Sequence, residues 1–122
     1  MNGNVLPYQT WKQEYERELD PSMELMAVGV GGGYPPGIFS QMGKFFDENL
    51  IKEVCLLADD VWLKFIEKKK GVKVKWARNS LCHPYKIADK TLEFTGLVNE
   101  NLQKNRNDTF ISNCEKFFNI KL

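Results

Sequence analysis

Two short segments, GVGGGYPPG at residues 29–37 and ADDVW at residues 58–62, decide how the rest of the sequence is interpreted. The first has five glycines and two prolines in nine residues, a composition that neither a helix nor a regular strand accommodates. Glycine permits a positive φ or a close approach of the backbone to another group, and the two prolines then favour an extended Tyr34. The segment therefore predicts a loop that closely approaches a ligand or another strand, or a tight glycine turn without a ligand.

The second segment opens the most regular predicted helix, residues 59–70. Its apolar residues recur at helical spacing, three lysines lie in its last turn, and Gly71 follows as a natural stop. Two adjacent acids on an apolar background indicate a helix cap, a catalytic carboxylate, or both. We expect Asp59 either to cap this helix or to open it.

The remaining periodicities predict an α/β fold, a small mixed sheet with flanking helices in a single domain over residues 1–122. Residues 72–76 alternate apolar and polar side chains, as a half-buried strand does, and residues 23–30 form a nearly continuous apolar run that predicts a buried strand. Three further helices are predicted at residues 10–19, at 47–57 with Asp47 as its cap, and at 108–119 with Asn107 as its cap.

Composition limits the classes of function. An apolar fraction of 43% supports a packed core, and the net charge of +1 argues against a nucleic-acid partner. Three scattered cysteines give neither a disulfide framework nor a zinc site, and their odd number without a signal peptide predicts a cytoplasmic protein. No apolar run reaches the ~18 residues that span a bilayer. Six lysines between Lys64 and Lys75 leave contact with the inner face of the membrane as an alternative to a solvated helix end.

Read together, these segments resemble the C-terminal half of bacterial polysaccharide-type glycosyltransferases of the GT-A kind. The resemblance is carried, in order, by NVLPYQTW at residues 4–11, GVGG at 29–32, YPPG at 34–37, ADDVW at 58–62, and Asn107-Asp108. It covers nearly the whole chain. It implies the acceptor side of a site that transfers a sugar from a nucleotide-sugar donor to a polysaccharide or lipid-linked acceptor.

The resemblance also implies roles for single residues. Asp60 or Asp59 would be the base that activates the acceptor hydroxyl. The backbone at Gly31 and Gly32 would approach the sugar. The remaining substrate-binding residues would be Tyr34 and Trp62, as an apolar wall for the sugar, with Asn107 and Asp108.

Two departures from the family pattern matter. The glycine segment is one residue shorter than usual, and the chain contains no Asp-x-Asp motif, which in such enzymes binds a divalent metal, Mn or Mg. The half of the domain that carries this motif and the first strands has no counterpart here. We therefore expect no metal site in this chain and no sugar transfer by the isolated chain. The competing interpretation is a truncated, non-catalytic α/β binding or interaction module. Either way, an open sheet edge and an uncovered apolar face predict a homodimer through residues 23–30 or the neighbouring sheet edge.

Overall fold

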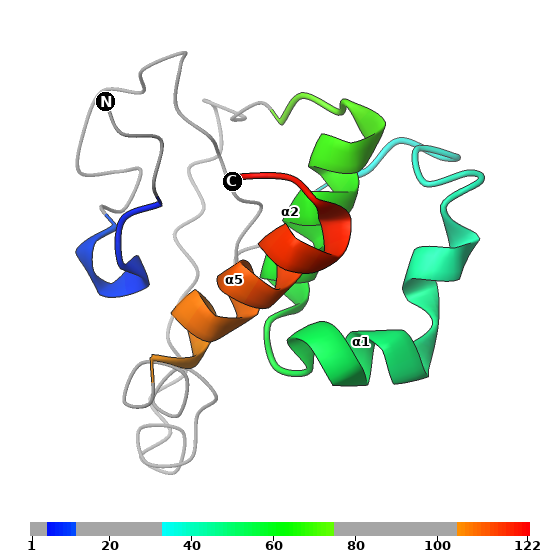
Figure 1. Ribbon diagram of the computed structural model, residues 1–122. Helices are drawn as coiled ribbons and strands as arrows, with labels where there is room; N and C mark the ends of the chain where they lie inside the picture. Colours follow the sequence, from blue (N-terminus) through cyan, green and yellow to red (C-terminus); the bar gives the residue numbers. More distant parts are fainter. Residues whose placement is uncertain (1–4, 12–32, 75–104) are drawn as a thin grey trace, which may run out of the picture.

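The structure is a computed structural model that describes residues 5–11, 33–74 and 105–122 (Figure 1). These ranges hold three α-helices and two short 3₁₀-helices. The α-helices are α1 (Glu48–Cys55), α2 (Asp59–Lys70) and α5 (Arg106–Phe118), and the 3₁₀-helices are η1 (Tyr8–Thr10) and η3 (Gly43–Phe46).

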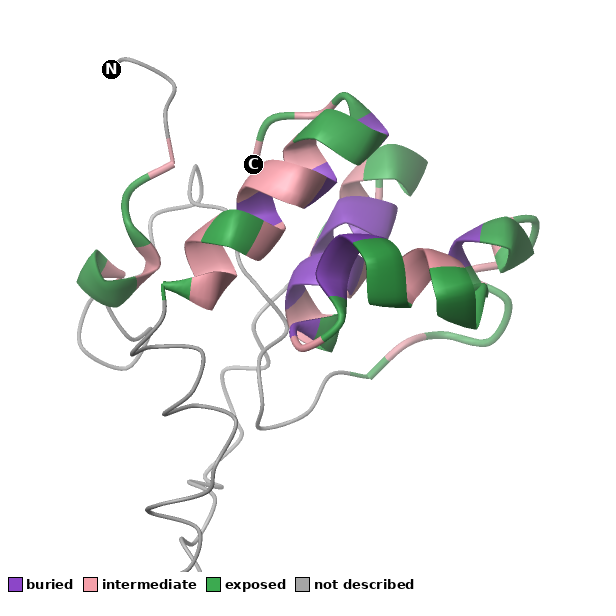
Figure 2. Ribbon diagram, turned by 60° about the horizontal axis from the view of Figure 1, so that its bottom comes forward, coloured by how far each residue is buried: buried purple, intermediate pink, exposed green. Residues whose placement is uncertain are grey.

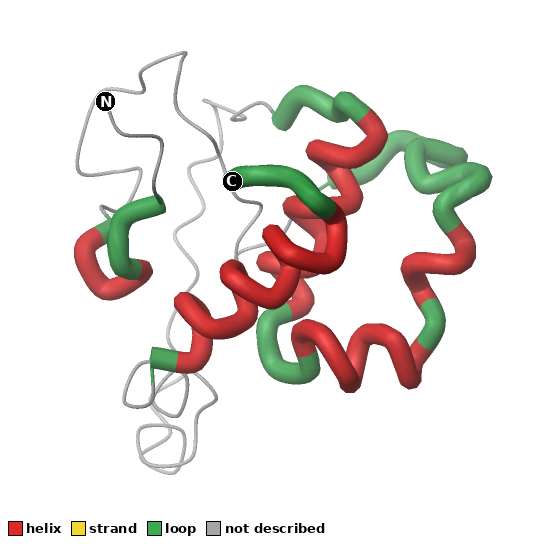
Figure 3. Tube along the Cα trace, viewed as in Figure 1, coloured by secondary structure: helices red, strands yellow, loops and turns green. Residues whose placement is uncertain are grey.

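The predicted α/β fold is wrong for the described part of the chain, which is helical and contains no strand (Figure 3). The predicted strand at residues 72–76 shows why. Val72, Lys73 and Val74 are described, and they form no regular element. Val72 and Val74 are half-buried and Lys73 is exposed. The alternating sequence pattern therefore predicted which side chains are buried, but these described residues form no strand. The strand predicted at residues 23–30, with its dimer surface, lies outside the described residues.

The hydrogen bonds at the end of α2 explain why no strand begins at Val72. Gly71 adopts φ +73°, its N–H donates to the carbonyl of Lys68, and the N–H of Val72 donates to the carbonyl of Glu67 over 2.9 Å. This is the hydrogen-bond pattern of a Schellman turn. Because the helix end uses the N–H of Val72, that group is not available to a sheet ladder.

Helix starts were predicted with mixed success. Asp47 caps α1 as expected, since its carboxylate accepts the Leu50 N–H at 3.0 Å. The cap position of α2 is Ala58, with no side-chain hydrogen bond, so Asp59 opens the helix, which was one of the two alternatives, and does not cap it. α5 begins after Asn105, which has φ +48°, so Asn107 lies inside the first turn rather than at the cap.

The core lies where α1, α2 and α5 meet, and α2 contributes more buried residues to it than either of the other two helices (Figure 2). Phe118, near the end of α5, is the centre of the aromatic cluster in this core. Its ring lies 5.0 Å from Trp62, 5.3 Å from Phe45 and 5.6 Å from Phe65, centroid to centroid. The Trp62 indole N–H donates to the Phe45 carbonyl at 2.8 Å, which ties η3 to α2. This packing fixes the N-terminus of α2 relative to α5.

Replacing Gly71 with alanine is expected to lower the free energy of unfolding by about 1–2 kcal/mol, because a Cβ disfavours the left-handed backbone. Gly43→Ala is the matched control: its φ is not positive and an added Cβ meets no atom within 4 Å. Urea denaturation followed by circular dichroism measures both. Equal losses in the two variants would contradict the role assigned to the left-handed turn.

Candidate functional site

The candidate site begins at the N-terminus of α2. Asp59 is exposed in the first turn, where a carboxylate suits the positive end of the helix dipole. Asp60 is half-buried, and its Oδ1 accepts the N–H of Val61 at 2.8 Å. Burial raises the pKa of the Asp60 carboxyl above its ordinary value, and the charge of Asp59 acts in the same direction. The two adjacent acids therefore have different environments.

The N-terminal segment docks beside the start of α5. The backbone N–H of Tyr8 donates to Asp108 Oδ1 over 2.8 Å, and the Gln9 amide donates to Asn105 Oδ1 over 2.9 Å. The Trp11 indole N–H donates to the Leu6 carbonyl at 2.8 Å, which holds the segment in a compact turn. Two stretches almost a hundred residues apart in sequence are thus joined side by side.

Tyr8 also connects this junction to α2. Burial raises the pKa of the Tyr8 hydroxyl, and the negative charge of Asp60 raises it further. Tyr8, Asp60 and Asp108 come from three of the segments that carry the family resemblance. A hydrogen bond joins the first of these segments to the third, and the start of α2 acts on Tyr8 through the charge of Asp60.

An open groove of about 440 Å³ adjoins this junction. It runs between the N-terminal segment and α5, and it combines an apolar wall with carboxylate, hydroxyl and ammonium groups. Glu115 and Lys121 form an ion pair at its edge, with 2.8 Å between Lys121 Nζ and Glu115 Oε2. Its lining residues are Val5, Leu6, Pro7, Asp108, Ile111, Ser112, Glu115 and Lys121. Apolar surface with a few fixed polar groups is the usual lining of a small-molecule site.

Two buried thiols lie close to Asp60. Cys55 ends α1 and Cys114 belongs to α5, and both thiols are free and buried. The Cys55 thiol donates to the Ala58 carbonyl at 3.2 Å. The neighbouring Cys114 thiol, burial and the charge of Asp60 all raise the pKa of the Cys55 thiol. The Cys55 thiol is therefore a neutral packing group at the end of α1, facing α5 and the start of α2.

The other predicted site residues are placed apart from this junction. Trp62 is 2% exposed in the core, so its indole packs against α5 and does not face the groove. Tyr34 donates its hydroxyl to Glu67 Oε1 at 2.9 Å, further along α2. Asn107 is half-buried in the first turn of α5 beside Asp108. Gly31 and Gly32 lie outside the described residues.

Sequence reasoning overlooked Glu67 and misplaced Lys64. Lys64 was assigned to a solvated helix end and Glu67 was given no role, yet the two side chains are 3% and 1% exposed, although Lys and Glu are rarely buried. The available signal was their spacing: Asp60, Lys64 and Glu67 stand at i, i+4 and i+7, one face of a helix.

The part of the chain that the structure describes holds no group of three or more side chains suited to bind a metal ion. Among its helices, none has the length and apolar character needed to cross a bilayer. Comparison of the sequence and structure with known protein families, curated proteins and solved structures finds no match.

The raised pKa of Asp60 predicts a specific dependence of stability on pH. A carboxyl whose pKa is higher folded than unfolded binds more protons in the folded state, so the free energy of unfolding falls as pH rises from about 3.9 through the folded pKa. Asp60→Asn should abolish this fall and be more stable than the wild type at neutral pH. Urea denaturation at several pH values in this range measures the free energy of unfolding of both proteins. If that of Asp60→Asn falls with pH in parallel with that of the wild type, the prediction is contradicted.

Proposed function

We propose that this chain supplies the acceptor side of a sugar-transfer site, in which a polysaccharide or lipid-linked glycan offers a hydroxyl to a nucleotide-sugar donor. The observation that carries the proposal is the hydrogen bond between the Tyr8 N–H and Asp108, which lines the groove, with Asp60 close enough for its charge to raise the pKa of the Tyr8 hydroxyl. These residues belong to separate segments, each of which resembles a segment of polysaccharide-type glycosyltransferases. The acceptor glycan is proposed to lie in the groove.

Asp60 is the proposed general base. A sugar hydroxyl is a weak nucleophile, and a carboxylate within hydrogen-bond reach removes its proton as the new glycosidic bond forms. The raised pKa of Asp60 brings its basicity closer to neutral pH, where general-base catalysis is most efficient. The exposed carboxylate of Asp59 is proposed to accept a hydrogen bond from a neighbouring acceptor hydroxyl.

Asp108 has a different proposed role. Its Oδ1 is engaged by the backbone of Tyr8, so it holds the N-terminal segment against α5 and shapes one end of the groove. In the family that the chain resembles, Mn or Mg stabilises the diphosphate leaving group. The described residues do not offer the ligands for such an ion, so the proposal assigns no metal-dependent step to them.

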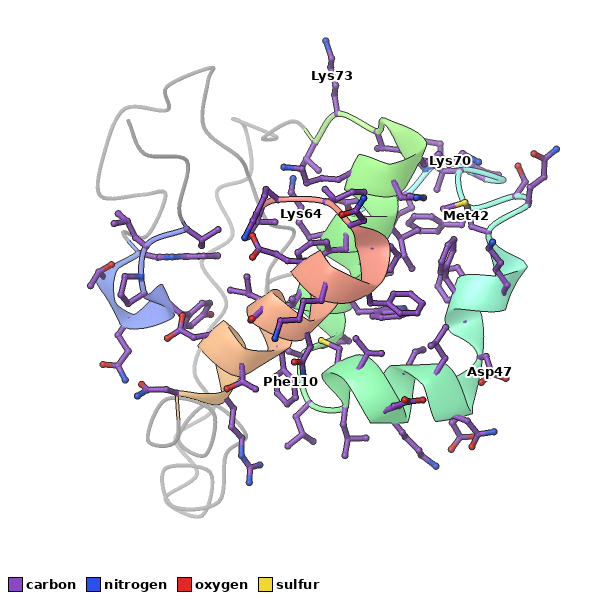
Figure 4. All side chains as sticks on the ribbon, in the orientation of Figure 1. Met42, Asp47, Lys64, Lys70, Lys73 and Phe110 are labelled. Carbon is purple, nitrogen blue, oxygen red and sulfur yellow. The ribbon has the colours of Figure 1, made fainter. Side chains whose placement is uncertain are left out.

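The proposed place of action is the cytoplasm, at the inner face of the membrane where lipid-linked acceptors lie. Exposed cations at the end of α2 support this part of the proposal: Lys69, Lys70 and Lys73 are all solvent-exposed. Figure 4 shows Lys73 pointing away from the helices, beyond Lys70. Anionic headgroups attract such cations by about 1 kcal/mol each near the surface.

Binding of oligosaccharides to the chain tests the proposal. The wild type is expected to bind members of an immobilised panel of neutral and acidic oligosaccharides, with the dissociation constant then measured by calorimetry. Asp60→Asn should weaken binding about 10- to 100-fold, because a hydrogen bond to a charged group contributes about 1.5–3 kcal/mol.

Asp47→Asn is the matched control, since it makes the same chemical change at an exposed helix cap and Asn caps about as well as Asp. It should bind like the wild type. No binding to any member of the panel, or equal binding by Asp60→Asn, would overturn the proposed function. Turnover of a nucleotide sugar by the isolated chain with Mn or Mg would instead show that the chain also provides the donor side.

A further inference from the structure

The charges that line the groove are few and unequal in sign. Its two sides are the N-terminal segment and α5, which lie next to each other in Figure 1. Residues 5–11 contain no Asp, Glu, Lys, Arg or His, so this side of the groove is uncharged. The other side contributes the carboxylates of Asp108 and Glu115 and the ammonium of Lys121. Two negative groups against one positive group leave the lining with a net negative charge.

The one ammonium in this lining already has a partner. Lys121 Nζ lies 2.8 Å from Glu115 Oε2, and Glu115 Oε1 accepts the N–H of Leu122 at 3.3 Å. The side chain of Glu115 is only 13% exposed, so turning Lys121 towards a ligand would leave a largely desolvated carboxylate without its counter-charge. Lys121 therefore compensates Glu115. No cation of the described residues forms an ion pair with Asp108, so the charge of Asp108 is left to act on a ligand in the groove.

Asp108 keeps one carboxylate oxygen for a ligand. The residue is half-buried in the first turn of α5, and its Oδ1 accepts the Tyr8 N–H at 2.8 Å. None of the described residues donates a hydrogen bond to its Oδ2. The pKa of the Tyr8 hydroxyl is raised by burial and also by the charge of Asp60, so a second carboxylate acts on this end of the groove. A ligand there meets negative charge together with an oxygen that accepts a hydrogen bond.

We propose that the groove takes a neutral glycan in preference to an acidic one, and that Asp108 is the residue that sets this preference. This inference rests on the proposed function and narrows the class of its acceptor. The apolar wall, which includes the exposed Leu6, suits the C–H face of an uncharged pyranose ring, and Asp108 Oδ2 accepts a hydrogen bond from one of the ring hydroxyls. A uronic acid would bring its own carboxylate against that of Asp108, and like charges in a partly desolvated site repel each other.

Three ligands with one skeleton test the preference: a neutral oligosaccharide of the panel, its counterpart with one uronic acid in place of a neutral sugar, and the methyl ester of that counterpart. In calorimetry at low salt, the wild type should bind the neutral compound and the ester each about tenfold more tightly than the acid, the effect of about one net repelling charge. Raising the ionic strength from about 0.02 M to about 0.5 M should shrink this ratio, because salt screens the charges. A purely structural role of Asp108 gives no such dependence on salt.

Variants with matched controls assign the preference to the groove. Asp108→Asn keeps an oxygen for the Tyr8 N–H and removes the charge, so the acid should bind within about threefold of the neutral compound. Asp47→Asn makes the same change at an exposed carboxylate outside the groove and should keep the wild-type ratio. Lys121→Met removes the ammonium and should widen the ratio about threefold, whereas Lys116→Met, at an exposed position of α5 outside the lining, should not.

The results that would contradict this preference differ from those that would contradict the proposed function. Equal or tighter binding of the acid by the wild type would overturn the preference while the proposed function stands, and an unchanged ratio in Asp108→Asn would overturn the role of Asp108. Failure of the wild type to bind any oligosaccharide would overturn the proposed function, and this inference with it. Circular dichroism checks that the variants fold. If Asp108→Asn does not, the salt dependence of the wild-type ratio and the ratio in Lys121→Met decide.

Discussion

Replacing Phe118 with alanine is expected to lower the free energy of unfolding by about 3–5 kcal/mol, the range for a buried phenylalanine. The side chain is 3% exposed and its ring packs against Phe65, Trp62 and Phe45, so truncation removes the contact that joins α5 to α2 and η3. Urea denaturation followed by circular dichroism measures the loss.

The adjacent residue supplies the control. Phe117 is 42% exposed, so Phe117→Ala removes the same atoms from the same helix with less lost burial. Its expected loss is about 1–2 kcal/mol, from the smaller apolar area involved. Similar losses at the two positions would mean that Phe118 is not the centre of the core.

Glu67→Met alone is expected to destabilise the fold by about 3 kcal/mol or more, because it removes the described carboxylate from beside the buried ammonium of Lys64. The paired change of both residues to methionine should restore most of the stability, since an apolar pair of similar volume often replaces a buried ion pair at no loss. Denaturant titration of the two single variants and the paired variant gives the coupling energy. A paired variant whose loss equals the sum of the single losses would show that the two charges do not compensate each other.

The sequence predicted those features of the fold that depend on local chemistry. Asp47 caps α1 because a carboxylate at that position reaches the Leu50 N–H whatever else surrounds it. Gly71 ends α2 because the left-handed turn there favours glycine. The apolar spacing of α5 predicts that Ile111, Cys114, Phe117 and Phe118 dock the helix. Ile111, Cys114 and Phe118 do lie in the core, whereas Phe117 is 42% exposed.

The prediction of a mixed sheet was wrong because alternating apolar and polar residues indicate which side chains are buried. They do not show that the backbone pairs with another strand. Val72 and Val74 are partly buried as a strand would have them, but the N–H of Val72 is already bonded to α2. The capping alternative for Asp59 fails for a related reason. The residue type suits a cap, yet the helix begins one residue earlier, and Asp59 contributes through the helix dipole instead.

For the candidate site, the family resemblance indicated candidate segments of the sequence, but it did not predict which residues contact one another. It grouped the stretches that contain Tyr8, Asp60 and Asp108, of which the structure joins Tyr8 to Asp108 by a hydrogen bond, while Asp60 affects Tyr8 through its charge. It also selected Trp62, which lies in the core, and it gave no reason to choose Glu67. A buried glutamate could not be recognised from its surface-favouring residue type, because its burial depends on tertiary packing.

The hydrogen bond from Tyr8 to Asp108 has a consequence for the order of folding. It joins residues 100 positions apart, whereas α1 and α2 are consecutive helices with a short connection. Closing so long a loop loses much chain entropy, and contacts of this kind generally form after local ones. We therefore expect the N-terminal segment to dock last and to detach first, in an opening that leaves the helices intact. The Tyr8 amide should then exchange its hydrogen with solvent faster than amides in the middle of α2, which makes it a natural reporter of whether the groove is assembled.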